Sequence, residues 1–149
     1  MKPPSIDKQS YNRPMFPYSE PKLVTDPALV AILEELKARE PIFHHPEFGT
    51  TRADFERMMA AAFWEVGASG RRYSRESILD ELGRRYSSGY LEGKLDATDF
   101  HCCQLADGTY LVTYTLLQDT RKTRRATIWQ RAGLEWKIVF HQGTIVQGE

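Results

Sequence analysis

The sequence predicts an α+β fold in which three N-terminal helices pack on an antiparallel β-sheet. Apolar residues recur at helical spacing in three segments that precede residue 84. The later part of the chain carries four segments rich in β-branched and aromatic residues, at 95–105, 109–117, 124–131 and 135–144. Helices followed by a run of strands are typical of α+β proteins, whose helices gather on one face of the sheet.

Capping and stop signals bound the first two helices. The first begins at Asp26-Pro27, an N-cap followed by a proline at the first helical position, and Pro41 ends it. The second begins at Thr51 and is expected to end near Phe63. It places four apolar side chains on one face, namely Phe55, Met58, Met59 and Ala62.

A short strand or hook is expected at residues 63–67, because this bulky segment is followed by a turn signal. Ser74 then caps the third helix, and Gly83 lies near its end. The dipeptides Asp107-Gly108 and Ala132-Gly133 fall where hairpin turns belong. The last four segments are therefore predicted to form a meander.

Residues 1–26 are predicted to form a proline-rich extended arm outside the domain, which spans residues 27–149. The arm holds five of the eight prolines and has neither helical nor alternating apolar periodicity. Its aromatic residues indicate that part of it docks on the domain or on a partner, because a purely solvated linker has little use for them: Tyr11, Phe16 and Tyr18.

Composition argues against several classes of partner and cofactor. The 20 Lys and Arg residues balance the 20 Asp and Glu residues, so no global field attracts nucleic acid or an anionic membrane. No apolar run approaches the length of a membrane span and the first residues are polar, so we expect a cytoplasmic protein. No phosphate loop, nucleotide fingerprint or Cys-x-x-Cys motif occurs, and no cofactor is expected. The pair His44-His45 lacks a third ligand at metal spacing, so no metal site is expected.

The order of these elements resembles the nuclear transport factor 2-like superfamily over residues 29–146, and within it the SnoaL-like / domain of unknown function 4440 branch. The motifs that carry the resemblance are 63–67 (Phe-Trp-Glu-Val-Gly), 73–76 (Tyr-Ser-Arg-Glu), 125–129 (Arg-Ala-Thr-Ile-Trp) and 136–144, which ends in His-Gln-Gly-Thr. The resemblance implies a cone whose curved sheet and helices enclose a pocket, and a tendency to dimerise. It implies no single activity, because the superfamily includes isomerases, dehydratases, kinase association domains and transport proteins.

An isomerase or cyclase of this kind needs a carboxylate base in an apolar pocket, close to a proton donor. Glu65 and Asp99 are the acids embedded in apolar strand context. Asp99 and His101 lie two residues apart and so share one strand face, which makes them a candidate catalytic dyad. The alternative is that this face is turned to solvent.

Candidate ligand-binding residues lie on two neighbouring strands. Arg125 and Trp129 alternate on one face, and Gln142 is expected to continue the face set by Trp136, Ile138 and Phe140. A guanidinium beside an aromatic wall and an amide suits a small anionic or carbonyl ligand. An ion pair between Arg125 and Glu65 remains open as the alternative. His141 has the opposite orientation to Gln142, so one of the two should reach the pocket, and Tyr73 is a further candidate as a packing residue or an acid.

Two functions follow from these patterns. The first is a small-molecule-binding or protein-interaction module without catalysis, and the second is a cofactor-free lyase, isomerase or cyclase that acts on a small carbonyl compound. A nucleic-acid or toxin-neutralising partner protein ranks third. A homodimer through the convex face of the sheet is also predicted, with three aromatic side chains at its interface: Tyr110, Tyr114 and Trp129.

Overall fold

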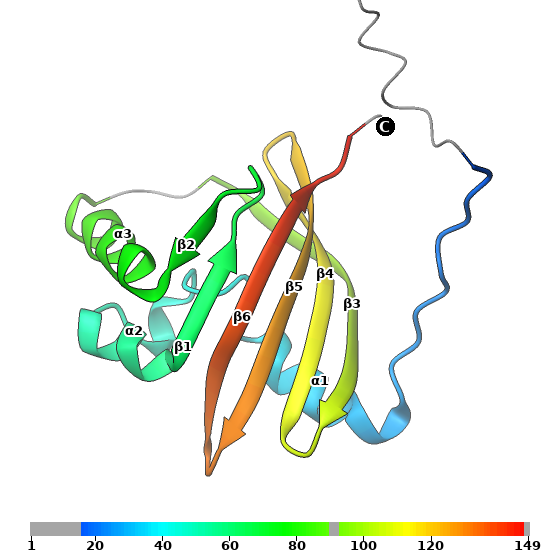
Figure 1. Ribbon diagram of the computed structural model, residues 1–149, viewed down its shortest axis with the longest axis horizontal. Coiled ribbons are helices and arrows are strands. Elements are labelled where there is room, and N and C mark those ends of the chain that lie inside the picture. Colours follow the sequence, from blue (N-terminus) through cyan, green and yellow to red (C-terminus); the bar gives the residue numbers. More distant parts are fainter. Residues whose placement is uncertain (1–15, 90–92, 148–149) are drawn as a thin grey trace, which may run out of the picture.

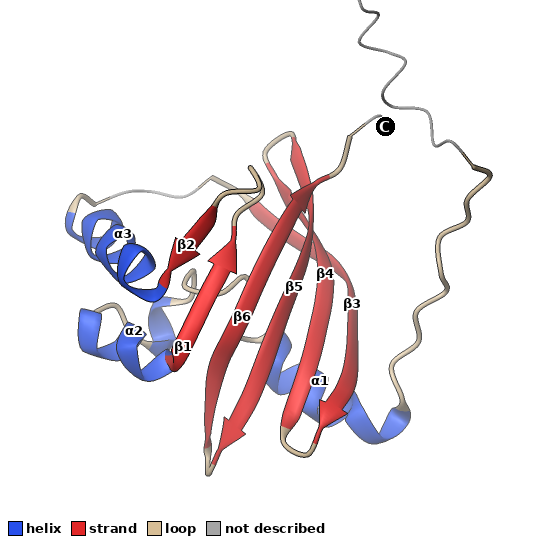
Figure 2. Ribbon diagram, viewed as in Figure 1, coloured by secondary structure: helices blue, strands red, loops and turns tan. Residues whose placement is uncertain are grey.

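The computed structural model describes residues 16–89 and 93–147 of the 149-residue chain. Within these residues the chain forms three α-helices and one six-stranded sheet of order β2-β1-β6-β5-β4-β3 (Figures 1 and 2). β1 pairs in parallel with β6, and the other neighbours are antiparallel. The α+β class and the four-stranded meander are confirmed. The expectation of a purely antiparallel sheet is wrong, because β1 joins the meander in parallel.

The predicted caps form, two of them at the second and third helices, while Asp26 caps a 3₁₀ turn that precedes the first α-helix. Asp26 accepts a hydrogen bond from the Ala28 amide at 2.9 Å, Thr51 one from Asp54 at 3.2 Å, and Ser74 one from Ser77 at 3.1 Å. The helices are α1 (Val30–Lys37), α2 (Arg52–Met58) and α3 (Arg75–Ser87), and the 3₁₀ turns η2 (Pro27–Leu29) and η3 (Pro46–Phe48) precede the first two.

The strands are β1 (Met59–Val66), β2 (Arg72–Ser74), β3 (Leu95–Ala106), β4 (Thr109–Gln118), β5 (Arg121–Ala132) and β6 (Glu135–Ile145). The second helix therefore ends at Met58, and the prediction that it continues to Phe63 is wrong. Met59 pairs with Ile138 of β6, and strand pairing overrides the helical preference of the alanines that follow.

The core lies between the helices and the face of the sheet that they cover, here called the inner face. Figure 1 shows α1 crossing behind β3 and β4, while α2 and α3 lie beside β1 and β2. Leu36 of α1 and Leu79 of α3 are fully buried against this face. Tyr110, Tyr114 and Trp129 are only 8%, 3% and 2% exposed. The prediction that they form a convex dimer surface is wrong, because their strand positions point inward to the helices.

The described part of the arm, residues 16–26, is extended and mostly exposed. Two contacts tie it to the sheet. Glu20 forms a 3.0 Å salt bridge with Arg124, and Thr25 Oγ1 accepts a hydrogen bond of 3.2 Å from the Cys102 amide. Tyr11 lies outside the described residues, and the division into an arm and a domain stays a prediction.

Candidate functional site

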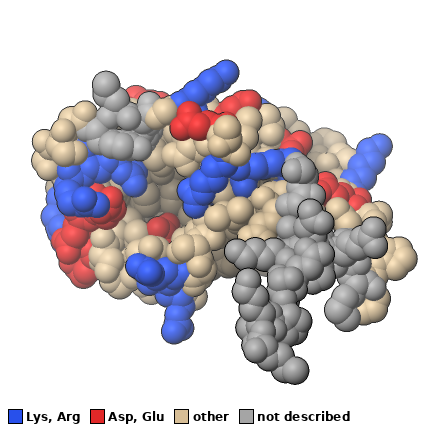
Figure 3. Space-filling view, turned by 90° about the horizontal axis from the view of Figure 1, so that it is seen from above, with Lys and Arg blue, Asp and Glu red and all other residues tan. Residues whose placement is uncertain are grey.

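Three polar side chains converge at a small cavity between the inner face and α3. Glu65 of β1 lies opposite His141 of β6, and Arg125 of β5 lies opposite Gly143 on the other side of β6. The cavity has a volume of about 110 Å³. Its remaining lining comes from the segment after α1 and from α3: Ile42, Phe43, His44, Ile78, Glu81, Leu82 and Arg85. Figure 3 looks onto the end of the molecule where β1 and β6 finish and shows a hollow edged by Lys and Arg side chains.

His141, and not Gln142, reaches this cavity. The register between β5 and β6 shifts where Ile128 pairs with Phe140 but Trp129 pairs with Ile138, which leaves Val139 as an extra residue. The bulge reverses the alternation, so Phe140 and Gln142 point outward and His141 points inward. The prediction that Gln142 continues the face of Trp136 and Ile138 is therefore wrong.

Arg125 is a half-buried cation held by polar side chains. Its Nε donates to Thr123 Oγ1 at 2.9 Å, and one terminal nitrogen lies 3.4 Å from His141 Nε2. Gly143 leaves room for the guanidinium, since a Cβ there would lie 3.2 Å from Arg125 Nε. Within residues 16–89 and 93–147 no salt bridge joins Arg125 to a carboxylate, and Glu65 acts on its pKa only through longer-range electrostatics. Burial lowers the pKa of Arg125. The ordinary pKa of a guanidinium is so high that the group still remains charged at neutral pH.

Glu65 is the acid of the cavity. Burial raises its pKa, and the positive charges of Arg125 and Arg85 partly oppose this effect. A carboxyl group with a raised pKa that faces a cavity holds a proton more readily than an exposed one, which suits a group that accepts and returns protons.

His141 is a neutral imidazole. Burial, reinforced by the positive charge of Arg125 and by His44, lowers its pKa to about 3. Its Nδ1 lies 2.8 Å from Thr127 Oγ1, and neither group is exposed to solvent. One ring nitrogen therefore donates and the other accepts at physiological pH.

Glu40 is a buried polar residue that the sequence analysis missed. It lies in the segment after α1, is 4% exposed, and accepts hydrogen bonds from Tyr114 Oη at 2.7 Å, Trp129 Nε1 at 3.1 Å and the Ile42 amide at 3.1 Å. Burial raises the pKa of Glu40 to about 7, although these donors and Thr127 favour the ionised form. An acid followed by proline and two bulky apolar residues was the signal available in the sequence.

The other predicted ligand-binding residues lie away from the cavity. Trp129 binds Glu40 and lines a neighbouring cavity of about 170 Å³. Gln142 lines a groove of about 820 Å³ between the arm and the outer face of the sheet. Tyr73 pairs with Glu65 across β1 and β2 and packs against the core. Of the six predicted residues the structure brings together Glu65, Arg125 and His141.

Asp99 and His101 do not lie at the cavity either. The register of β3 shifts between Thr98 and His101, and Asp99 has a positive φ of 57°. The Asp99 side chain is 70% exposed and lies 3.6 Å from Arg124 in the outer groove, while His101 pairs with Thr113. The two do not form a pair on a regular strand face, and their catalytic role stays a prediction.

The fold is that of the nuclear transport factor 2-like superfamily. An NTF2-like protein from Cytophaga hutchinsonii superposes with a TM-score of 0.58 at 15% identity, covering 78% of this chain and 96% of the other. A putative dehydratase of the NTF2-like family from Streptomyces avermitilis gives 0.59 at 16% identity, covering 81% and 96%. A putative Ca/calmodulin-dependent kinase II association domain from Exiguobacterium sibiricum gives 0.57 at 15% identity, covering 86% and 100%.

No family model and no curated protein matches the sequence. These likenesses therefore establish the fold, and the SnoaL-like / domain of unknown function 4440 branch stays a prediction. No helix in the described part of the chain is long and apolar enough to span a membrane. The same residues contain no cluster of three or more His, Cys, Asp or Glu side chains arranged to hold a metal ion.

Proposed function

We propose that the cavity formed by Glu65, Arg125 and His141 binds a small molecule that carries a carboxylate or carbonyl group. It corresponds to the cone pocket that the family resemblance implies. The observation that supports the proposal is the guanidinium of Arg125, which lines the cavity without a direct ion pair among the described residues. A charge partly withdrawn from water is stabilised by an acceptor of opposite charge, so a ligand with a matching acceptor would complete the site.

The size of the cavity limits this ligand to a few heavy atoms. Its volume of about 110 Å³ is well below the roughly 300 to 1,000 Å³ of pockets that hold drug-sized ligands. Two- to four-carbon acids and carbonyl compounds are therefore the compounds to screen, by thermal shift on the purified protein. A compound that binds here should raise the melting temperature of the wild type but not that of an Arg125→Met variant.

A second candidate function is cofactor-free proton transfer on a small carbonyl compound, as in a lyase, isomerase or cyclase. The raised pKa of Glu65 favours it, because a carboxyl group that titrates closer to neutral pH suits a general base. One protein of similar fold is described as a putative dehydratase. A cytoplasmic location stays a prediction under either function.

Glu65→Gln should separate binding from catalysis. If Glu65 is a base, the protein should speed hydrogen exchange at the carbon next to the carbonyl of pyruvate in heavy water, followed by proton NMR. The variant should then lose about 10²- to 10⁴-fold of that rate while still binding the compound. Arg124→Met, on the outer face, is the control and should exchange at the wild-type rate. Equal rates with and without wild-type protein would contradict the catalytic function for this class of compound.

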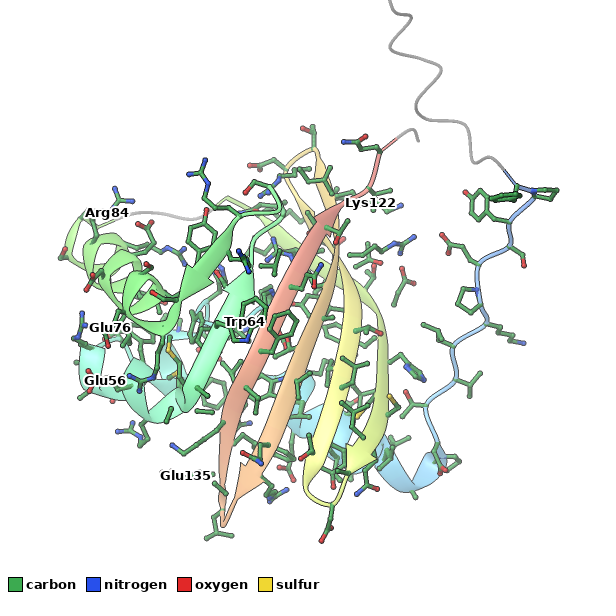
Figure 4. The ribbon with its side chains drawn as sticks, viewed as in Figure 1. Glu56, Trp64, Glu76, Arg84, Lys122 and Glu135 are labelled. Atoms are coloured by element: carbon green, nitrogen blue, oxygen red, sulfur yellow. The ribbon has the colours of Figure 1, made fainter. Side chains whose placement is uncertain are left out.

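We also propose a homodimer through the outer face of the sheet, with a different set of residues from that predicted. One row of apolar side chains crosses five strands, each paired with the next: Trp64, Phe140, Ile128, Leu111 and Cys103. Trp64 is 44% exposed and contacts Phe140 at 4.8 Å between ring centres, and Figure 4 shows it between β1 and β6. A continuous apolar row on a sheet face favours association with an identical face.

Light scattering at micromolar concentration should give about twice the chain mass of 17.2 kDa. Trp64→Glu would place a charge in the row and should shift the mass to that of a monomer, while Lys137→Glu, on β6 outside the row, should not. A wild-type protein with the monomer mass would contradict the dimer.

A further inference from the structure

We propose a second binding site, for an acid with a single aromatic ring, in the cavity lined by Trp129, Trp136 and Arg39. This cavity has a volume of about 170 Å³. It is separate from the polar cavity of the proposed function, because the two linings have only Ile42 and Phe43 in common. The inference therefore does not depend on the proposed function.

The second cavity lies near the β5–β6 turn, whereas the polar cavity is lined by His141, further along β6. Figure 4 shows Glu135, one of the residues that line the second cavity, beside that turn. Leu134, in the turn itself, also lines the cavity and is 94% exposed, so the cavity reaches the surface. A small molecule can therefore enter it from solvent.

The walls of the cavity offer aromatic surface and no free polar group. Phe55, Trp129 and Trp136 line it and are buried. Both indole N–H groups already have acceptors in the chain. Trp129 Nε1 donates to Glu40 at 3.1 Å, and Trp136 Nε1 donates to Glu35 at 2.9 Å. The two tryptophans can therefore present only ring surface to a ligand.

The volume of the cavity suits one six-membered ring. A cavity of about 150 Å³ with apolar walls holds one benzene molecule. A ligand ring could pack here by the edge-to-face contact that Phe43 already makes with Phe55, at 5.9 Å between ring centres. Size and lining together therefore favour a single aromatic ring.

Arg39 supplies a positive charge at this apolar space. It is half-buried, its guanidinium lies 4.5 Å from the ring centre of Phe48, and one terminal nitrogen donates to the Glu35 carbonyl at 2.9 Å. No carboxylate in the described part of the chain forms a salt bridge with Arg39, and Glu35 acts on its pKa only through longer-range electrostatics. Its remaining N–H donors can bind a ligand carboxylate through two parallel hydrogen bonds.

The other charged and polar groups of the lining are less suited to hold the acid. Arg57 already forms a 2.9 Å salt bridge with Asp54. Both ring nitrogens of His45 lie within 3.3 Å of oxygen atoms of the chain. Glu135 is negatively charged and repels an anion. The carboxylate of the ligand should therefore bind at Arg39.

The test is a titration of the ¹⁵N-labelled protein with benzoate, phenylacetate and 3-phenylpropionate, followed at the indole N–H signals of the 3 tryptophans. At least one of these acids should shift the signals of Trp129 and Trp136 in a saturable manner. The signal of Trp64, which is 44% exposed on the outer face, should stay in place. Trp64→Phe and Trp136→Phe assign the signals. Binding of none of the acids, or shifts at Trp64 alone, would overturn the second site.

The contribution of Arg39 is measured by comparing the acid that binds best with its primary amide, which has nearly the same shape but no charge. The acid should bind the wild type about 10-fold more tightly, and Arg39→Met should remove most of this advantage without weakening the amide. Lys37→Met is the control, because Lys37 lies 5.2 Å from the ring centre of Phe100 and outside the cavity. It should change neither affinity. Equal binding of acid and amide by the wild type would overturn the role of Arg39.

Arg125→Met distinguishes the two cavities. If the aromatic acid occupied the polar cavity, Arg125→Met would lose binding and Arg39→Met would not. That result would overturn the second site. Loss of binding in Arg39→Met alone would support it, whatever the two- to four-carbon acids do, so the two proposals can fail independently.

Discussion

Arg125→Met should weaken binding of a small acid by about ten- to more than a hundredfold while leaving the protein folded. A hydrogen bond to a charged group contributes roughly 1.5 to 3 kcal/mol, and methionine retains much of the side-chain length without the charge. The free energy of unfolding should stay within about 1 kcal/mol of the wild-type value or rise. The variant loses the hydrogen bonds to Thr123 and His141, but it also avoids the cost of desolvating the guanidinium. Affinity by calorimetry and stability by urea denaturation, compared at one pH, test this.

Arg124→Met is the matched control, because Arg124 is the next residue and points to the opposite face, where it contacts Glu20 and Thr115. It should leave binding unchanged. A structural ion pair between Arg125 and Glu65 would give a different pattern. Arg125→Met would then lose on the order of 3 to 5 kcal/mol, and Glu65→Gln in the same chain would restore much of it. That pattern would contradict the binding role of Arg125.

Glu40→Ala should lower the free energy of unfolding by roughly 3 to 5 kcal/mol, because a buried donor left without its acceptor costs about 1 to 3 kcal/mol. The change strands the Tyr114 hydroxyl, the Trp129 indole N–H and the Ile42 amide, and water entering the space left by the side chain recovers part of the loss. Glu35→Ala is the control, because Glu35 also accepts an indole N–H, from Trp136 at 2.9 Å, but at an exposed position. It should cost about 1 kcal/mol or less.

The pH dependence of stability should reveal the titration of Glu40. Its pKa of about 7 in the folded state lies above the ordinary value of 4.5, so between these values the folded protein binds more protons than the unfolded chain. Its contribution to stability is complete below pH 4.5 and is lost as the pH rises to 7. The stability of wild type minus that of Glu40→Gln should therefore fall, by on the order of 3 kcal/mol, across this interval.

His141 acts in the opposite direction. Its pKa of about 3 in the folded state lies below the ordinary value of 6.5, so its contribution is present above pH 6.5 and is lost as the pH falls toward 3. Because both proteins contain His141, its effect should largely cancel in the difference. A difference that stays flat between pH 4.5 and 7 would show that Glu40 does not titrate there.

Most of the fold could be predicted from the sequence, because the helix starts and the hairpin turns carry clear local signals. Thr51 and Ser74 cap α2 and α3, and Asp26 caps the 3₁₀ turn that leads into α1. The predicted hairpin turns fall at Asp107-Gly108 and, one residue later than expected, at Gly133-Leu134. The end of the second helix was not predictable in this way. Met59 lies in a strand because it pairs with β6. That pairing joins parts of the chain that are far apart in the sequence.

The site was only partly predictable. The alternation of side chains along a strand tells which face of the sheet each one lies on, but a bulge reverses that alternation. The extra residue Val139 exchanges the orientations of His141 and Gln142, and the register shift after Thr98 removes Asp99 from a regular face with His101. Glu65 and Arg125 lie on regular stretches near the cavity and were found. Glu40 was missed because its burial depends on three donors, two of which lie on β4 and β5.

The most direct test of the proposed site is a titration of the ¹⁵N-labelled protein with L-lactate, followed at the Arg Nε–H and histidine ring signals. Binding at the cavity should shift the signals of Arg125 and His141 in a saturable manner and leave that of Arg124 in place. Saturable shifts at Arg124, which lines the outer groove, with His141 unchanged would place the ligand in that groove. That result would contradict the assignment of the cavity as the binding site.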